Sequence, residues 1–131
     1  MIATAITGGC QCGAVRFRIR GALGRPSICH CRMCQKAFGN FFAPLVTAIG
    51  LEWTRGAPAT FASSNKVRRG FCRTCGSALF FDPPARDWIA IAMGAFDKPT
   101  GTRLAKHIFT ADKGDYYDIA DGVPQEQRPP A

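Results

Sequence analysis

Cysteines dominate the chemistry that this sequence can support. Seven of the 131 residues are cysteines, and they occur in three short groups. The central group is Cys29-His30-Cys31-Arg32-Met33-Cys34, with Cys10 and Cys12 before it and Cys72 and Cys75 after it. Thiols one residue apart pair poorly in a disulfide, because disulfide geometry restricts their separation and angle. C-x-C and C-x-x-C spacing is instead typical of zinc ligands.

Glycines that follow some of the thiols divide the seven cysteines into two sets. Gly13 follows Cys12 and Gly76 follows Cys75, whereas Cys34 has no such glycine. A glycine there lets the chain turn with positive φ and direct amide N–H groups at sulfur. A structural zinc takes four protein ligands, and a catalytic zinc takes three and keeps one position open. We therefore predict a four-cysteine set for structural zinc (Cys10, Cys12, Cys72 and Cys75) and a three-cysteine set for catalytic zinc (Cys29, Cys31 and Cys34).

Other interpretations of the thiols and of the two histidines stay open. All seven cysteines could be buried apolar residues or disulfide partners, and Cys31 with Cys34 could form the reversible disulfide of a redox protein. The occurrence of the cysteines in three groups with chelating spacing favours metal binding over these alternatives. His30 lies between two candidate ligands, so an extended backbone points its side chain away from the metal. We expect it either to be exposed or to contact the ligands without binding the metal. His107 lies in a predicted strand, where we expect a structural role.

The composition indicates a globular protein of one domain. The hydrophobic content is 47%, the mean hydropathy is −0.04, and the length suits a single core. No apolar run approaches the ~20 residues that a membrane span needs. The first residues lack the features of a signal peptide. Together with cysteines spaced for metal, these features predict a protein of the reducing cytoplasm.

The formal charge of +8 limits the possible partners. Four thiolates on Zn²⁺ carry about −2 and three carry about −1, so two filled sites leave a net charge of roughly +5. The remaining excess suits an anionic ligand. No block of lysines and arginines and no interleaved aromatic motif is present, so nucleic acid is not an expected partner.

Short segments with strand patterns must position these cysteines. In residues 14–20, Val15, Phe17 and Ile19 alternate with three arginines, which predicts a half-buried strand with a basic outer face. Further strands are predicted at 2–7, 41–49, 51–54, 59–63, 66–72, 78–81, 88–93 and 105–109, and a short helix at 33–38. We expect a mainly β fold of packed sheets over residues 1–124, followed by a loose tail over 125–131.

Five segments resemble one known family over nearly the whole chain. They are residues 9–17 (GCQCGAVRF), 29–36 (CHCRMCQK), 71–77 (FCRTCGS), 107–109 (HIF) and 115–117 (DYY). The sequence is similar to the zinc-binding, centromere protein V-like family of glutathione-dependent formaldehyde-activating enzymes. The resemblance implies a β-tent fold of antiparallel sheets stapled by a structural zinc, with a catalytic zinc at Cys29, Cys31 and Cys34. It also implies addition of glutathione sulfur to formaldehyde, a carbon–sulfur lyase reaction read in reverse.

Basic residues near the thiols are candidates for binding glutathione. Arg32, Lys36 and Arg73 are the nearest in sequence to the ligands, and their charge suits the carboxylates of the tripeptide. A function of another class also fits the sequence: a non-catalytic zinc-stapled module that binds an acidic partner or nucleic acid.

Overall fold

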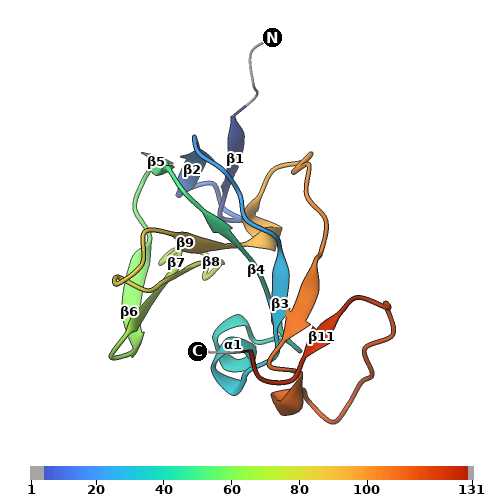
Figure 1. Cartoon of the computed structure of the whole chain (residues 1–131). Coiled ribbons are helices and arrows are strands. Elements are labelled where there is room, and N and C mark those ends of the chain that lie inside the picture. Colours follow the sequence, from blue (N-terminus) through green and yellow to red (C-terminus); the bar gives the residue numbers. More distant parts are fainter. Residues whose placement is uncertain (1–4, 130–131) are drawn as a thin grey trace.

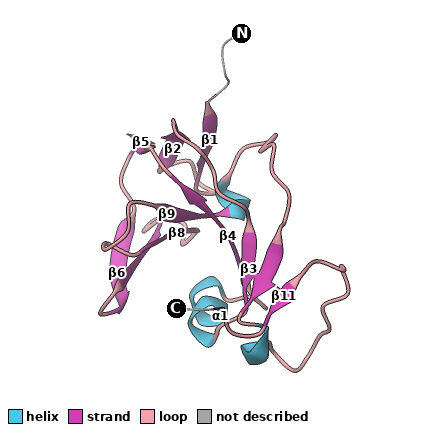
Figure 2. Cartoon of the chain, in the orientation of Figure 1, coloured by secondary structure: helices cyan, strands magenta, loops and turns pink. Residues whose placement is uncertain are grey.

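The computed structural model describes residues 5–129, and strands make up most of its regular structure. The strands are β1 (Ile6–Gly9), β2 (Arg16–Ile19), β3 (Ser27–Cys29), β4 (Ala43–Ala48), β5 (Leu51–Arg55), β6 (Ala59–Ser64), β7 (Val67–Phe71), β8 (Ala78–Asp82), β9 (Ile89–Ala92), β10 (Lys106–Ile108) and β11 (Gln125–Glu126). The helices are α1 (Arg32–Phe38) and two 3₁₀ turns, η1 (Met93–Ala95) and η2 (Thr110–Asp112). Figure 2 shows how little of the chain is helical, so the predicted mainly β class is confirmed.

The strands form two sheets. The smaller has the order β1-β2-β5, and the larger has the order β11-β10-β3-β4-β9-β8-β7-β6. In Figure 1 the small sheet lies at the top, and α1 lies at the lower centre, near the lower end of β3. Most neighbours are antiparallel, as predicted, but β10 is parallel to both β3 and β11. Residues 109–124 connect β10 to β11, a segment long enough to return the chain for a parallel pairing. No helix within residues 5–129 is long and apolar enough to cross a membrane.

Strand β2 follows the predicted alternation. Phe17 and Ile19 are buried in the core. The arginines face outward and form ion pairs: Arg16 with Asp97 at 2.5 Å, Arg18 with Glu52 at 2.9 Å, and Arg20 with Glu52 at 2.7 Å. These partly exposed pairs contribute little to stability individually. The basic face is therefore a solvated surface that is largely matched by carboxylates.

Buried side chains form two clusters, and each contains cysteines. The larger cluster packs residues of β2, β4, β8 and β9 around Phe17, Leu79 and Ile91, and it includes Cys10 and Cys72. The smaller cluster comprises Cys29, Cys34, Ala43, Leu45 and Ala90. Each set of thiols is thus anchored in a core, which fixes its geometry.

Two ends of the chain differ from the expectation. The predicted first strand covered residues 2–7, of which 2–4 lie outside the described residues, and β1 extends to Gly9 instead. Gln125 and Glu126, expected at the start of a loose tail, form β11 and pair with His107 and Ile108. An ion pair of 3.2 Å between Lys106 and Glu126 adds to this pairing. These two polar residues form a strand because the edge of β10 offers backbone hydrogen-bonding groups with which they can pair.

Gly8 lets β1 approach η1 closely. A Cβ atom at this position would lie 2.3 Å from the backbone oxygen of Ala95 and 2.5 Å from Cζ of Phe17. We expect Gly8→Ala to lower the free energy of unfolding by about 1 to 3 kcal/mol, because neither the backbone nor the buried ring can move freely. Chemical denaturation measures this change. Gly94→Ala is the control, since its Cβ would meet nothing within 4 Å. Equal stability of the two variants would contradict the close approach.

Candidate metal centres and the adjoining cavity

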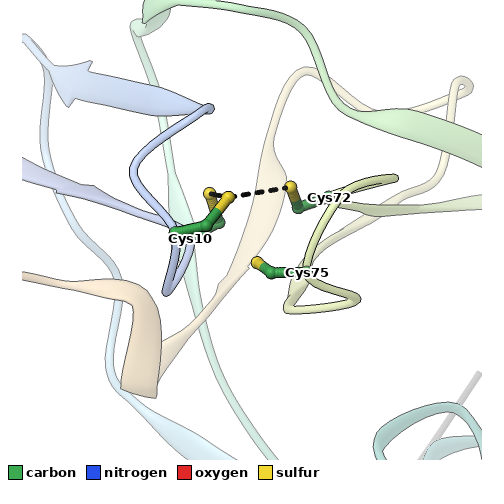
Figure 3. A group of neighbouring side chains, drawn as sticks. Cys10, Cys72 and Cys75 are labelled. Atoms are coloured by element: carbon green, nitrogen blue, oxygen red, sulfur yellow. Dashed lines mark hydrogen bonds between the residues drawn. The ribbon is translucent and has the colours of Figure 1, made fainter.

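The four-cysteine set lies where a turn of the small sheet contacts a turn of the large sheet. Cys10 and Cys12 lie between β1 and β2, and Cys72 and Cys75 lie between β7 and β8. Their four Sγ atoms all lie within 4.8 Å of one another. Figure 3 shows Cys10, Cys72 and Cys75 directed toward a common centre. An ion held here would join the two sheets, as the sequence predicts for a structural site.

The sulfur spacing of this set can be compared with the requirement of zinc. Cys10 and Cys12 have their Sγ atoms 3.6 Å apart, and Cys12 and Cys72 have theirs 3.8 Å apart. Two thiolates at about 2.3 Å from a tetrahedral zinc lie about 3.8 Å from each other. The Cys10–Cys12 and Cys12–Cys72 distances therefore match those of two ligands on a tetrahedral zinc.

Local hydrogen bonds shape the two turns. Gly13 and Gly76 have φ values of 81° and 78°, so both adopt the positive φ that the sequence predicts. The Val15 N–H donates to Sγ of Cys10 at 3.3 Å. Ser77 hydrogen bonds to Cys75 and lowers the pKa of that thiol to about 5. The turn after β7 thus presents, at Cys75, a sulfur atom that already favours the thiolate state of a metal ligand.

The three-cysteine set forms around the start of α1. Cys29 ends β3, Cys31 is the N-cap of α1, and Cys34 lies in its first turn. The three Sγ atoms lie within 4.8 Å of one another, and the Cys34 N–H donates to Sγ of Cys31 at 3.4 Å. The predicted helix ends at Gly39, with φ 57°. The helix therefore brings together three thiols that the sequence predicts to act together.

Thiol ionisation within the three-cysteine set is uneven. Hydrogen bonds from Cys29 and then Cys34 lower the pKa of Cys31 to about 2. The hydrogen bond to Cys31 and then that to Cys34 raise the pKa of Cys29. The set thus gives up one proton readily and holds the others, since adjacent thiolates repel. A cation at the centre of the set removes that repulsion.

Arg69 of β7 is a site residue that the sequence analysis missed. Its side chain is buried, its Nη2 donates to Sγ of Cys34 at 3.4 Å, and its Nε donates to Oγ of Ser63 at 2.9 Å. Its Nη1 is buried without a partner in the described part of the chain. Arg68 and Arg69 are adjacent in a predicted strand, so alternation requires that they face opposite sides. That alternation was the available signal for an inward arginine.

The three-cysteine set borders a cavity of about 450 Å³. Apolar side chains from β4, β8, β9 and β10 make up most of its walls, and Arg69 also lines it. The lining residues other than the cysteines and Arg69 are Arg25, Ser27, Met33, Leu45, Thr47, Phe81, Trp88, Ala90, Ile108, Phe109 and Asp112. Arg25, Met33 and Asp112 are exposed, so they form the rim. A small molecule in this cavity can reach the sulfur cluster.

The basic residues chosen from sequence proximity lie elsewhere. Arg32 and Lys36 are exposed on α1 and border a separate hollow of about 330 Å³ together with Phe41 and Tyr116. Arg73 is exposed in the turn of the four-cysteine set. The structure therefore does not bring these three cations to the cavity beside the three-cysteine set.

Both histidines belong to one buried network. His30 shares a hydrogen bond of 2.9 Å with His107 and another of 2.9 Å with the hydroxyl of Tyr117. His107 in turn contacts Asp121 at 2.7 Å. Burial lowers the pKa of His30 to about 4. The expectation that His30 lies away from the metal ligands agrees with this geometry, whereas an exposed position does not.

The network holds the C-terminal segment against the three-cysteine set. Tyr117 packs on the His30 ring with centroids 6.1 Å apart, and Phe41 packs on Tyr116 at 4.7 Å. The Gln35 amide donates to the carbonyl of His30 at 2.6 Å and to that of Asp112 at 2.9 Å. These contacts hold residues 112–117 against His30 and Gln35, beside the three-cysteine set.

Comparisons with known proteins agree with this arrangement. A family model described as "Glutathione-dependent formaldehyde-activating enzyme" matches residues 5–112. A protein of Halomonas elongata with the name "Putative glutathione-dependent formaldehyde-activating enzyme" is 29% identical over 126 residues, which cover 87% of this chain and 80% of that one. A crystal structure of a Rhodobacter sphaeroides protein has a TM-score of 0.61 at 23% identity, covering 72% of this chain and 91% of that chain, and shows a similar fold. The chain belongs to the glutathione-dependent formaldehyde-activating enzyme family.

Proposed function

We propose that the protein is a zinc-dependent carbon–sulfur lyase-type enzyme that joins a thiol such as glutathione to formaldehyde or another small electrophile. The four-cysteine set holds a structural zinc, and the three-cysteine set holds a catalytic zinc. One observation carries this proposal: three clustered sulfur donors, one fewer than a closed site needs, border a cavity large enough for a small molecule. A zinc bound there supplies Lewis-acid chemistry to a thiolate or a carbonyl oxygen.

The protein side chains prepare the site in two ways. Three thiolates and Zn²⁺ carry a charge of about −1, and the buried Arg69 guanidinium beside Cys34 balances it. The apolar walls exclude water from the reacting atoms, which strengthens electrostatic interactions in the site.

The reaction is an addition that needs no oxidant or reductant. The thiol loses its proton, and a sulfur electron pair forms the new bond to the carbonyl carbon. The π electrons of the carbonyl move to oxygen, which takes up a proton to give a hydroxyl group. The residues of the cavity orient the two reactants, and such orientation is a large part of the catalysis of a two-substrate reaction.

Calorimetry with glutathione tests the proposed thiol recognition. Zinc-loaded protein should bind glutathione at millimolar concentration or tighter, and the S-methyl analogue should bind at least about tenfold more weakly, because it cannot form a thiolate. Higher salt should weaken glutathione binding moderately through its carboxylates. Equal affinity for both compounds, or no binding of glutathione, would favour the alternative of a non-catalytic binding module.

Arg69→Met should weaken metal binding at the three-cysteine set. The hydrogen bond to Cys34 and the balancing charge disappear, and loss of such a partner to a ligand typically lowers metal affinity about 10- to 100-fold. Competition with a chelator measures the change as release of one of the two bound zinc ions. Arg68→Met is the matched control, because the adjacent Arg68 is exposed and pairs with Asp82 instead. Identical zinc release from the two variants would count against this role.

A further inference from the structure

The cavity is much larger than formaldehyde requires. Formaldehyde has two heavy atoms and fills about the space of one or two water molecules, ~30–60 Å³. The cavity beside the three-cysteine set measures about 450 Å³, which lies within the usual range for sites that bind larger ligands. An electrophile that consists of a carbonyl group alone, without a larger substituent (here called its body), would leave most of this space to water.

The walls of the cavity indicate what kind of body fits. Phe81 and Trp88 contribute aromatic surface, Leu45 and Ile108 contribute branched aliphatic surface, and Ala90 leaves room between them. Leu45 and Ala90 are buried, and the other three are half-buried. A molecule held against these side chains gains from removal of apolar surface from water, provided that its own surface is apolar.

The charged groups of the cavity decide which reactant occupies it. Glutathione carries two carboxylates and an ammonium group, and burial of such groups without partners is costly. Arg25 and Asp112 are exposed at the rim, whereas Arg69 is the buried charge of the lining and already contacts Cys34. The charged ends of glutathione therefore suit the rim, and the apolar interior is left for the electrophile.

We propose that the electrophile is an aldehyde with an apolar body about the size of benzaldehyde, and that this body lies between Trp88, Phe81 and Ala90. This inference rests on the proposed function, because it names the second substrate of that reaction. The aldehyde carbon faces the thiol sulfur, and addition gives a hemithioacetal with the atom and electron balance already described. Formaldehyde is then a substrate that leaves the apolar walls unused.

The experiment compares two aldehydes with glutathione on zinc-loaded protein. The rate of hemithioacetal formation, measured by stopped-flow loss of free thiol, is divided by the rate without protein for each aldehyde. This ratio removes the intrinsic difference in reactivity between aldehydes. We expect the enhancement for benzaldehyde to exceed that for formaldehyde by about tenfold or more, since burial of the ring adds binding energy.

Two variants and a non-reactive probe locate the body in the cavity. Ala90→Phe should fill the cavity and Trp88→Ala should remove a wall, so each should lower the preference for benzaldehyde about tenfold. Ala62→Phe is the matched control, because Ala62 is exposed on β6 and does not line the cavity. Benzyl alcohol, which cannot add a thiol, should quench tryptophan fluorescence of the parent protein and should not bind Ala90→Phe.

The outcomes separate this inference from the proposed function. Equal or greater enhancement for formaldehyde, with no change in Ala90→Phe and Trp88→Ala, overturns the apolar aldehyde and leaves the proposed function intact. No enhancement with either aldehyde overturns the proposed function. In that case, loss of benzyl alcohol binding in Ala90→Phe would still support an apolar ligand in the cavity, and its unchanged binding would overturn that as well.

Discussion

Cys12→Ala should yield protein that is insoluble or unfolded, because it removes one ligand from the four-cysteine set. The apparent free energy of structural zinc binding is about 10–16 kcal/mol, and it is also folding free energy. A domain of this kind has a total stability of only about 5–15 kcal/mol. The set joins the turn after β1 to the turn after β7, so loss of the ion also removes the link between these two turns.

Cys12 is the most suitable cysteine for this test, because its side chain is exposed and its truncation affects metal binding without affecting core packing. Truncation there creates no cavity, whereas truncation of the buried Cys72 would combine loss of packing with loss of metal. Soluble yield, circular dichroism melting and zinc content are the measurements. Gln11→Ala, one residue earlier and also exposed, is the matched control and should melt like the parent. A soluble Cys12→Ala protein with a normal thermal midpoint and full zinc content would refute the structural assignment.

Cys31→Ala should fold, keep close to one zinc per chain, and lose its thiol chemistry. The three-cysteine set then offers two sulfur donors, too few to hold zinc tightly. The four-cysteine set is untouched, so the fold should persist. Metal analysis gives the zinc content, and the rate of glutathione addition to an aldehyde gives the activity, which we expect to fall to the uncatalysed rate.

A second substitution separates metal loss from helix capping. Cys31 is the N-cap of α1, so its removal also costs about 1 kcal/mol of helix stability. Cys31→Ser restores an acceptor for the Cys34 N–H but is a poor zinc ligand. Both variants should therefore lose activity, and the serine variant should be the more stable. Full activity in either, or two zinc ions per chain in both, would show that Cys31 is not a ligand.

Short-range patterns in the sequence were sufficient to predict the thiol sets and several elements. C-x-C and C-x-x-C spacing places the sulfur atoms of each turn together, because the turn itself sets their separation. Alternation in residues 14–20 predicted the buried face of β2, and the short helix predicted at 33–38 corresponds to α1. These features depend on backbone geometry over a few residues, which the chain carries locally.

The cavity and its arginine depended on contacts between residues far apart in the chain. Alternation states that Arg68 and Arg69 face opposite sides, but only the pairing of β7 with β6 and β8 decides that Arg69 faces Cys34. Sequence proximity pointed to Arg32 and Lys36 instead, because it cannot show on which side of α1 the cavity opens. The buried network of His30 likewise required residues 77 and 87 positions later. Long-range packing, which local spacing does not encode, decided which charges face the candidate site.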